Sequence, residues 1–119
     1  MSGTSNAYSL RWQRDAHRAL GEFLATATEL GMPALSWTIA ISGALVGDVD
    51  SLTLPPAEMR AAFATWAGCI GAKVLPERTD RDGVCNLYAT FAWAKNDQVR
   101  GAIRASIYPT LDEGGGPNV

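Results

Sequence analysis

The chain of 119 residues contains one histidine and two cysteines, fewer than most metal and catalytic sites need. His17 has no second histidine and no cysteine near it in the sequence, which argues against metal ligation. No G-x-S-x-G motif marks a nucleophilic serine. The glycines at 114–116 lack the Lys-Ser/Thr of a phosphate loop. We therefore expect a protein without enzyme activity, metal or cofactor.

The chain also lacks a strong net charge, a long apolar run and a signal-like N-terminus. Its net charge of −2 creates no field that would attract nucleic acid or an anionic membrane. No apolar stretch approaches the roughly 18 residues that a membrane span needs, and MSGTSNAYSLRWQRD has no apolar core. Cys69 and Cys85 are typical of free thiols in a reduced compartment, although a disulfide between them stays open. We expect a cytoplasmic protein that does not enter a membrane.

What is present is the composition of a globular domain. Apolar residues make up 47% of the chain and charged residues 18%, which argues against a disordered chain. The first residues are small and polar, and the last are rich in glycine. We expect a disordered N-terminus over 1–8, a single α+β domain over 9–109 and a flexible tail over 110–119.

Two segments have helical periodicity. The first, 9–30, repeats apolar side chains at spacings of three and four, and Gly31 and Pro33 follow it as a stop signal. Its apolar stripe consists of Trp12, Ala16, Leu20, Phe23, Leu24, Ala27 and Leu30. The second helix opens at the two prolines at 55–56, which suit a first turn, and ends at Gly71.

Other segments alternate apolar and polar residues as half-buried strands do. LSWTIAIS and ALVGDVDSL precede the second helix, and three strands follow near 72–81, 84–94 and 99–108. Short connections favour antiparallel pairing. The order α-β-β-α-β-β-β predicts a two-layer α+β sandwich, an antiparallel five-stranded sheet with two helices on one face. The first hairpin should lie beside the last strand, and Pro76, which cannot donate to a ladder, should place its strand at an edge.

The segment RTDRDG at 78–83 could begin a calcium loop or form a turn. An EF-hand loop would put Arg78 at its first ligand position and Ala89 at its last, where oxygen ligands are required. We therefore predict a hairpin with a two-residue Asp-Gly loop, which pairs Glu77 with Tyr88.

The next turn, AKNDQ, is predicted as a three-residue loop at 95–97. This loop places Arg104 opposite Tyr88, and Ile103 opposite Ala89. Apolar residues then stay on the core face, whereas a shorter or longer loop would bury an arginine there.

The opposite sheet face mixes aromatic, basic and small apolar residues. Water can cover such a face, but Tyr and Arg are also the usual anchors of protein interfaces. The residues that we expect to bind a partner are Tyr88, Arg104, Arg100, Leu75 and Tyr108. Since twofold dimers are the commonest oligomers, we expect a protein-interaction module whose simplest partner is a second copy of the chain.

A second function that fits the sequence is that of a nucleic-acid-associated accessory protein. Arg11, Arg14 and Arg18 form a stripe on the first helix that could contact phosphates, with help from Arg100 and Arg104. Asp15 and Glu22 on the same helix dilute this charge, so a solvated helix face is the default explanation of the stripe.

A third function is the binding of a small molecule in a Trp-lined pocket between the helices and the sheet. The chain has four tryptophans, Trp12, Trp37, Trp66 and Trp93. All four are predicted on core faces, where packing alone would explain them.

Asp48 and Asp50 lie on one side of a strand, where paired carboxylates could do acid–base work or simply face water.

The segments ERTDRDGVCNLYATFAW and VRGAIRASIYP resemble small, uncharacterised actinobacterial proteins. The likeness spans most of the chain. It implies an α+β domain, and it implies no activity and no functional residues.

Overall fold

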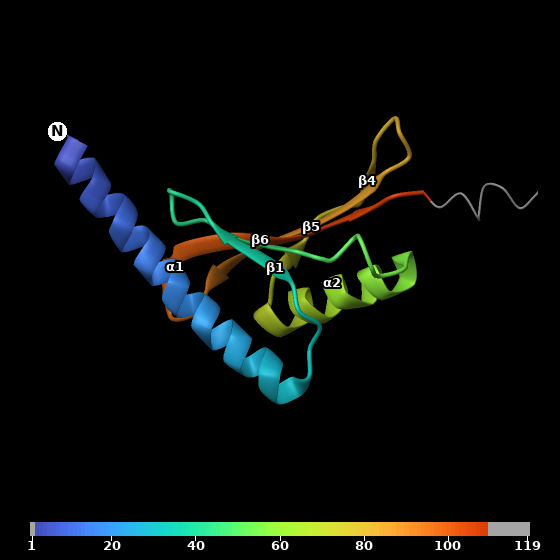
Figure 1. Ribbon diagram of the computed structural model, residues 1–119, viewed down its shortest axis with the longest axis horizontal. Coiled ribbons are helices and arrows are strands. Elements are labelled where there is room, and N and C mark those ends of the chain that lie inside the picture. The colour runs from blue at the N-terminus through green and yellow to red at the C-terminus, as the bar shows by residue number, and fades with distance from the viewer. Residues whose placement is uncertain (1, 110–119) are drawn as a thin grey trace, which may run out of the picture.

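The structure, a computed structural model, describes residues 2–109, so the predicted flexible tail at 110–119 lies outside the described residues. It is an α+β domain with two helices and six short or long strands (Figure 1). In chain order the elements are α1 (Ser2–Leu30), β1 (Ser36–Ile39), β2 (Leu45–Asp48), α2 (Pro56–Ile70), β3 (Lys73–Val74), β4 (Arg78–Thr79), β5 (Cys85–Trp93) and β6 (Asn96–Ile107).

Both helices end where their stop signals predict. After α1, Gly31 adopts a φ of 65°, and the N–H of Met32 donates to the carbonyl of Ala27. After α2, Gly71 adopts a φ of 77° and donates to the carbonyl of Ala67. The start of α1 differs from the prediction, because the helix includes residues 2–8, which we expected to be disordered.

The order of the strands across the sheet is β1-β2-β6-β5-β3, and β4 also pairs with β5. The first hairpin therefore lies beside the last strand, as predicted. The prediction of five antiparallel strands is wrong, because β2 and β6 run parallel, with Leu45 opposite Gly101. Antiparallel pairing follows from a short connection, and β2 and β6 are separated by α2 and three further strands.

The strand predicted at 72–81 is interrupted at Pro76. Its two ends survive as β3 and β4, and both pair only with β5 at the edge of the sheet. The edge position predicted from Pro76 is confirmed, and the lost donor explains the gap between the two short strands.

The turn between β4 and β5 has three loop residues instead of the predicted two. The N–H of Asp80 donates to Val84, and Gly83, with a φ of 84°, donates back to Asp80. One carboxylate oxygen of Asp80 accepts hydrogen bonds from the N–H groups of Asp82 and Val84. The carboxylate thus holds the turn. The extra residue shifts the register, so that Arg78, not Glu77, shares the face of Tyr88.

The pairing of β5 with β6 follows the predicted register along most of its length. Tyr88 lies opposite Arg104, and Ala89 lies opposite Ile103. At the tip the register shifts, and Trp93 pairs with Asn96, so the predicted three-residue loop at 95–97 is wrong. An irregularity in the strand pairing between Ala92 and Trp93 accommodates this shift in register.

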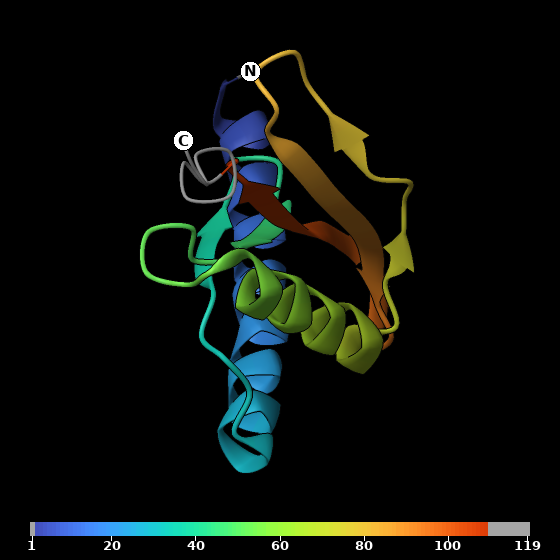
Figure 2. The ribbon, with the colours of Figure 1, turned by 90° about the vertical axis from the view of Figure 1, so that its right-hand side faces the viewer.

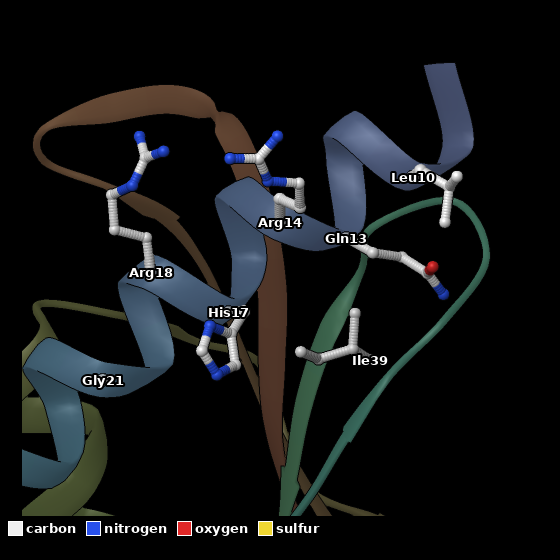
Figure 3. Close-up of a pocket in the computed structure, with 7 residues that line it drawn as sticks. All are labelled: Leu10, Gln13, Arg14, His17, Arg18, Gly21 and Ile39. Atoms are coloured by element: carbon white, nitrogen blue, oxygen red, sulfur yellow. The ribbon is translucent and has the colours of Figure 1, made fainter. Parts of the chain in front are cut away.

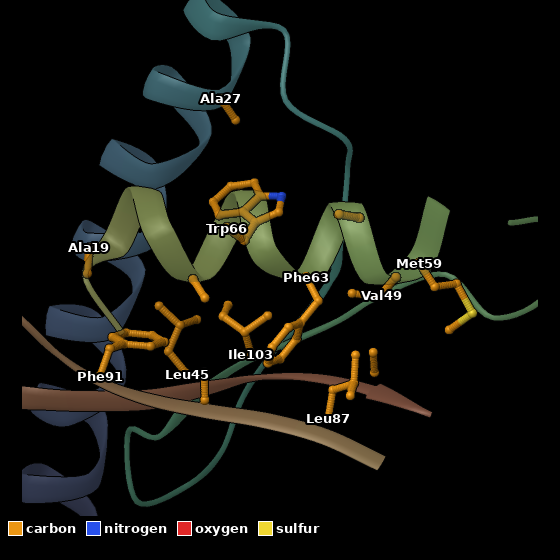
Figure 4. Packing of buried hydrophobic residues seen from close by; sticks show 14 of the residues in the cluster. Ala19, Ala27, Leu45, Val49, Met59, Phe63, Trp66, Leu87, Phe91 and Ile103 are labelled. Atoms are coloured by element: carbon orange, nitrogen blue, oxygen red, sulfur yellow. The ribbon is translucent and has the colours of Figure 1, made fainter. Parts of the chain in front are cut away.

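The core lies between the helices and the strands, where large side chains of α2 meet the sheet (Figure 4). Trp66 is 1% exposed and donates its indole N–H to the carbonyl of Pro33 at 2.7 Å. From α1, the ring of Phe23 meets that of Phe91 edge-on at 5.6 Å. Among residues 5–30 of α1 the buried side chains are alanines, which let the helix approach closely: Ala16, Ala19 and Ala27.

One predicted core tryptophan is not in the core. Trp12 is 45% exposed, and Leu24 and Leu30 of the same stripe are exposed as well. For Trp12 and Leu30 the reason is that α1 is longer than the sheet it crosses, whereas Leu24, next to the packed Phe23, faces outward. Its N-terminal end extends past the strands in Figure 1, and its C-terminal end does so in Figure 2. Neither helix, within residues 2–109, is long and apolar enough to cross a membrane.

Candidate functional site

The sheet face opposite the core, called the open face below, is centred on Tyr88 of β5 and Arg104 of β6. The two residues lie directly opposite each other, as predicted. The guanidinium of Arg104 donates to both carboxylate oxygens of Asp48 on β2, at 2.9 and 3.1 Å. These hydrogen bonds raise the pKa of Arg104 above its ordinary value. Sequence reasoning missed this pair because it depends on the parallel pairing of β2 with β6.

The other residues predicted for the open face lie around this centre. Leu75 donates its N–H to the carbonyl of Tyr88, and the side chain of Tyr108 is 57% exposed beyond the end of β6. Arg100 lies opposite Ala92 near the hairpin tip. Ala102, however, is only 3% exposed, so it adds little apolar surface to this face.

A hollow of about 610 Å³ lies at the interrupted edge of this face. Its lining residues are Leu75, Pro76, Arg78, Asn86 and Tyr88. We call it the edge hollow. Arg78 was not predicted there, because the predicted register placed Glu77 on this face, whereas Asn86 was expected on the same face as Tyr88. The carboxylate that caps the turn, in the motif Asp-x-Asp-Gly, is the sequence signal that could have shown the longer loop.

On the opposite side of the same edge, three polar side chains meet. Arg60 of α2 contacts the carboxylate of Glu77 at 2.7 Å, and the thiol of Cys85 donates to that carboxylate at 3.3 Å. The hydrogen bond from Arg60 is the main reason why the pKa of Glu77 is lowered, and the bond from Cys85 adds to it. Both cysteines are free thiols, with Cys69 exposed on α2.

The carboxylates of Asp48 and Asp50 do not form a paired site. Asp48 is bound to Arg104, whereas Asp50 accepts hydrogen bonds from the hydroxyl of Thr53 and the N–H of Leu52. The pKa of Asp50 is lowered mainly by the hydroxyl of Thr53. Each carboxylate therefore has a structural contact of its own. Among the described residues, no group of three or more His, Cys, Asp and Glu side chains could hold a metal ion.

The arginine stripe is brought together on α1. Arg11, Arg14 and Arg18 line a shallow hollow together with Asp15, which lies 3.8 Å from Arg18. Figure 3 shows Arg14 and Arg18 extending from one side of the helix. Arg104 belongs to the open face and is bound to Asp48. The five arginines of the nucleic-acid hypothesis therefore occupy two separate surfaces.

His17 lies on a different side of α1 from the arginine guanidinium groups (Figure 3). It lines an open hollow of about 680 Å³ together with Gln13 and Ile39, and Arg14 and Arg18 of the stripe border the same hollow. Gln13 donates to the carbonyl of Ala40 and ties the helix to the first hairpin. This arrangement places no cysteine or serine beside the imidazole among the residues that line the hollow.

The Trp-lined pocket corresponds to a small hollow between α1, α2 and the end of β5. Its volume is about 230 Å³, and Phe23, Trp66 and Trp93 are among its lining residues. An ion pair of 2.7 Å between Lys95 and Glu22 lies at the same place. The volume is below the range of about 300–1,000 Å³ that is usual for drug-sized ligands.

Comparison with known proteins adds no relative. No protein-family model matches the chain, and neither a curated protein nor a solved structure matches it.

Proposed function

We propose that this chain is a non-enzymatic protein-interaction module that associates with a second copy of itself through the open face. The proposal takes the fold as two layers, with both helices on the face opposite Tyr88 and Arg104. The edge hollow is the observation that carries it. There the ring of Tyr88, 40% exposed, lies beside Leu75 and Pro76. An aromatic anchor beside apolar surface is the kind of patch that a protein partner buries.

The charges at the centre of the open face are compatible with a second copy, while Arg78 of the edge hollow adds one positive charge to the face. In a twofold dimer the same patch of both chains meets itself, so a net positive patch would repel its copy. The charge of Arg104 is balanced by Asp48 within each chain. The centre of the face is therefore close to neutral, while Asn86 and Ser106 beside it are joined by a hydrogen bond of 3.0 Å.

Sedimentation velocity tests the proposal. We expect the protein to dimerise at micromolar concentration and the variant Tyr88→Asp to sediment as a monomer, because a carboxylate would then have to be buried in the interface. Leu52→Asp is the matched control. Leu52 is 94% exposed in the loop before α2, so this variant should dimerise as the parent does. A parent protein that stays monomeric at high micromolar concentration would overturn self-association.

A further inference from the structure

The N-terminal half of α1 passes the tip of the β5–β6 hairpin, and a hollow of about 350 Å³ lies between them. Tyr8 and Trp12 of α1 form one wall, with their rings stacked at 6.1 Å and inclined by 22°. The lining residues are Tyr8, Arg11, Trp12, Asp15, Asn96 and Gln98. We call it the helix–tip hollow.

Core packing does not account for these two rings. Tyr8 is 50% exposed and Trp12 is 45% exposed, whereas Trp66 is 1% exposed. The first hairpin approaches Trp12 at Gly43, where a Cβ would lie 2.6 Å from the Cβ of Trp12 and 3.0 Å from its carbonyl oxygen. A stacked pair of partly exposed aromatic rings can be extended by a nucleic-acid base, and such stacking depends little on sequence.

The hairpin tip adds hydrogen-bonding groups beside the rings. The amide oxygen of Asn96 accepts the N–H of Gln98 at 3.0 Å, and the amide nitrogen of Gln98 donates to Asp97 at 3.4 Å. Within the described chain, the other half of each amide makes no hydrogen bond. A donor on Asn96 and an acceptor on Gln98 therefore remain for the edge of a base.

The hollow continues into the arginine stripe, because Arg11 lines both. Arg14 and Arg18 follow along the same exposed side of α1. The one acidic side chain among these arginines is Asp15, at 3.8 Å from Arg18, which leaves the stripe with a net positive charge. Such a stripe is suited to phosphate groups that follow a stacked base.

We propose that the helix–tip hollow binds a base of single-stranded nucleic acid, with the adjoining phosphates on the arginine stripe. Base stacking and phosphate contacts contribute separately to the affinity, so a substitution can remove one and leave the other. The whole chain carries a net charge of −2, so the local stripe, not the global field, must supply the attraction. A free nucleotide shares this chemistry, and a comparison of ligands distinguishes it from a strand.

The test is fluorescence anisotropy of a labelled oligothymidylate of about ten nucleotides at low ionic strength. We expect binding whose logarithmic salt dependence has a slope of about −2, as three phosphate contacts on a single strand predict. Tyr8→Ala and Trp12→Ala should each weaken binding by about tenfold. Trp12→Ala could also disturb the packing of Trp12 near Gly43, whereas Tyr8→Ala leaves that packing intact. Circular dichroism checks that both variants are folded.

Arg14→Glu and Arg81→Glu form a matched pair for the phosphate contacts. Both remove one exposed arginine, but Arg81 lies in the turn between β4 and β5. Arg14→Glu should weaken binding and flatten the salt dependence, while Arg81→Glu should change both only slightly. Equal effects of the two variants, or no binding at low ionic strength, would overturn the proposal. Thymidine monophosphate that competes as well as the oligonucleotide would assign the hollow to a free nucleotide instead of a strand.

Discussion

Arg104 of β6 and Asp48 of β2 lie directly opposite each other across the parallel pair of strands, and two hydrogen bonds join their side chains. The contact ties the N-terminal hairpin to the C-terminal strands on the open face. It also neutralises the one arginine that lies opposite Tyr88. Any substitution of Arg104 therefore changes both the sheet and the proposed interface.

Removal of this ion pair should lower stability modestly. Both side chains are partly exposed, at 50% and 40%, so we expect Asp48→Asn to cost about 0.5–1 kcal/mol. Arg104→Glu should cost more, because it sets two carboxylates opposite each other. The exchange Asp48→Arg with Arg104→Glu should recover part of the loss. Urea denaturation measures all three, and a loss that the exchange does not reduce would mean that the pair itself contributes little.

Trp66 and Trp12 should differ sharply when truncated. Trp66→Ala removes a buried ring and its hydrogen bond to Pro33, and we expect a loss of about 3–5 kcal/mol. Trp12→Ala removes a ring that is 45% exposed, so the loss should stay near 1 kcal/mol. Denaturant titration compares them directly. Similar losses would show that the ring of Trp12 is packed far more closely than its exposure indicates.

Gly101 and Gly68 should respond to alanine in opposite directions. A Cβ at Gly101 would lie 1.8 Å from the carbonyl oxygen of Leu45 and 2.7 Å from the ring of Phe91. We expect Gly101→Ala to cost about 1–3 kcal/mol or more, because β2 must move away from β6. Gly68 has nothing within 4 Å of its Cβ position in α2, so Gly68→Ala should stabilise by about 0.4–1 kcal/mol. Thermal melts of the two variants check the signs.

The ion pair of Glu77 with Arg60 should make stability depend on pH. The pKa of Glu77 is lowered from its ordinary value of 4.5. A carboxyl with a lower pKa in the folded chain stabilises the fold above its unfolded pKa, and this contribution disappears as the pH falls through the folded pKa. Glu77→Gln should therefore lower the melting temperature near neutral pH and have progressively less effect in acid. Glu29→Gln, which removes another exposed carboxylate, is the control. A difference between parent and Glu77→Gln that persists unchanged in strong acid would refute the linkage.

The sequence predicted local structure better than long-range pairing. The register that sets Tyr88 opposite Arg104 follows from the alternation in β5 and β6, because any slip there would bury charge. The parallel direction of β2 relative to β6 cannot be predicted from the sequence, because no short connection links the two strands. For the same reason Asp48 could not be identified as the partner of Arg104.

The errors at α1 and at the β4–β5 turn have different causes. Helical periodicity shows which side of α1 is apolar, but not where the sheet beneath it ends, so Trp12 was placed in the core. At the turn, the Asp-Gly step alone predicts a two-residue loop, while the hydrogen bonds to the carboxylate of Asp80 stabilise a loop of three residues. Because the loop has one residue more than predicted, Arg78 lies on the open face where Glu77 was expected. The edge hollow therefore could not be predicted from the sequence.

The central place of β6 has a consequence for how the chain is made. β6 is the last strand among residues 2–109, yet it joins the first hairpin to β5 in the middle of the sheet. As the chain leaves the ribosome, β1 and β2 emerge early and have only each other to pair with, and an isolated hairpin is marginal in water. The apolar side of α2 then stays exposed to solvent until β6 has been synthesised. The sheet can therefore be completed only after β6 has been synthesised, and we expect apolar surface of this domain to stay exposed until then.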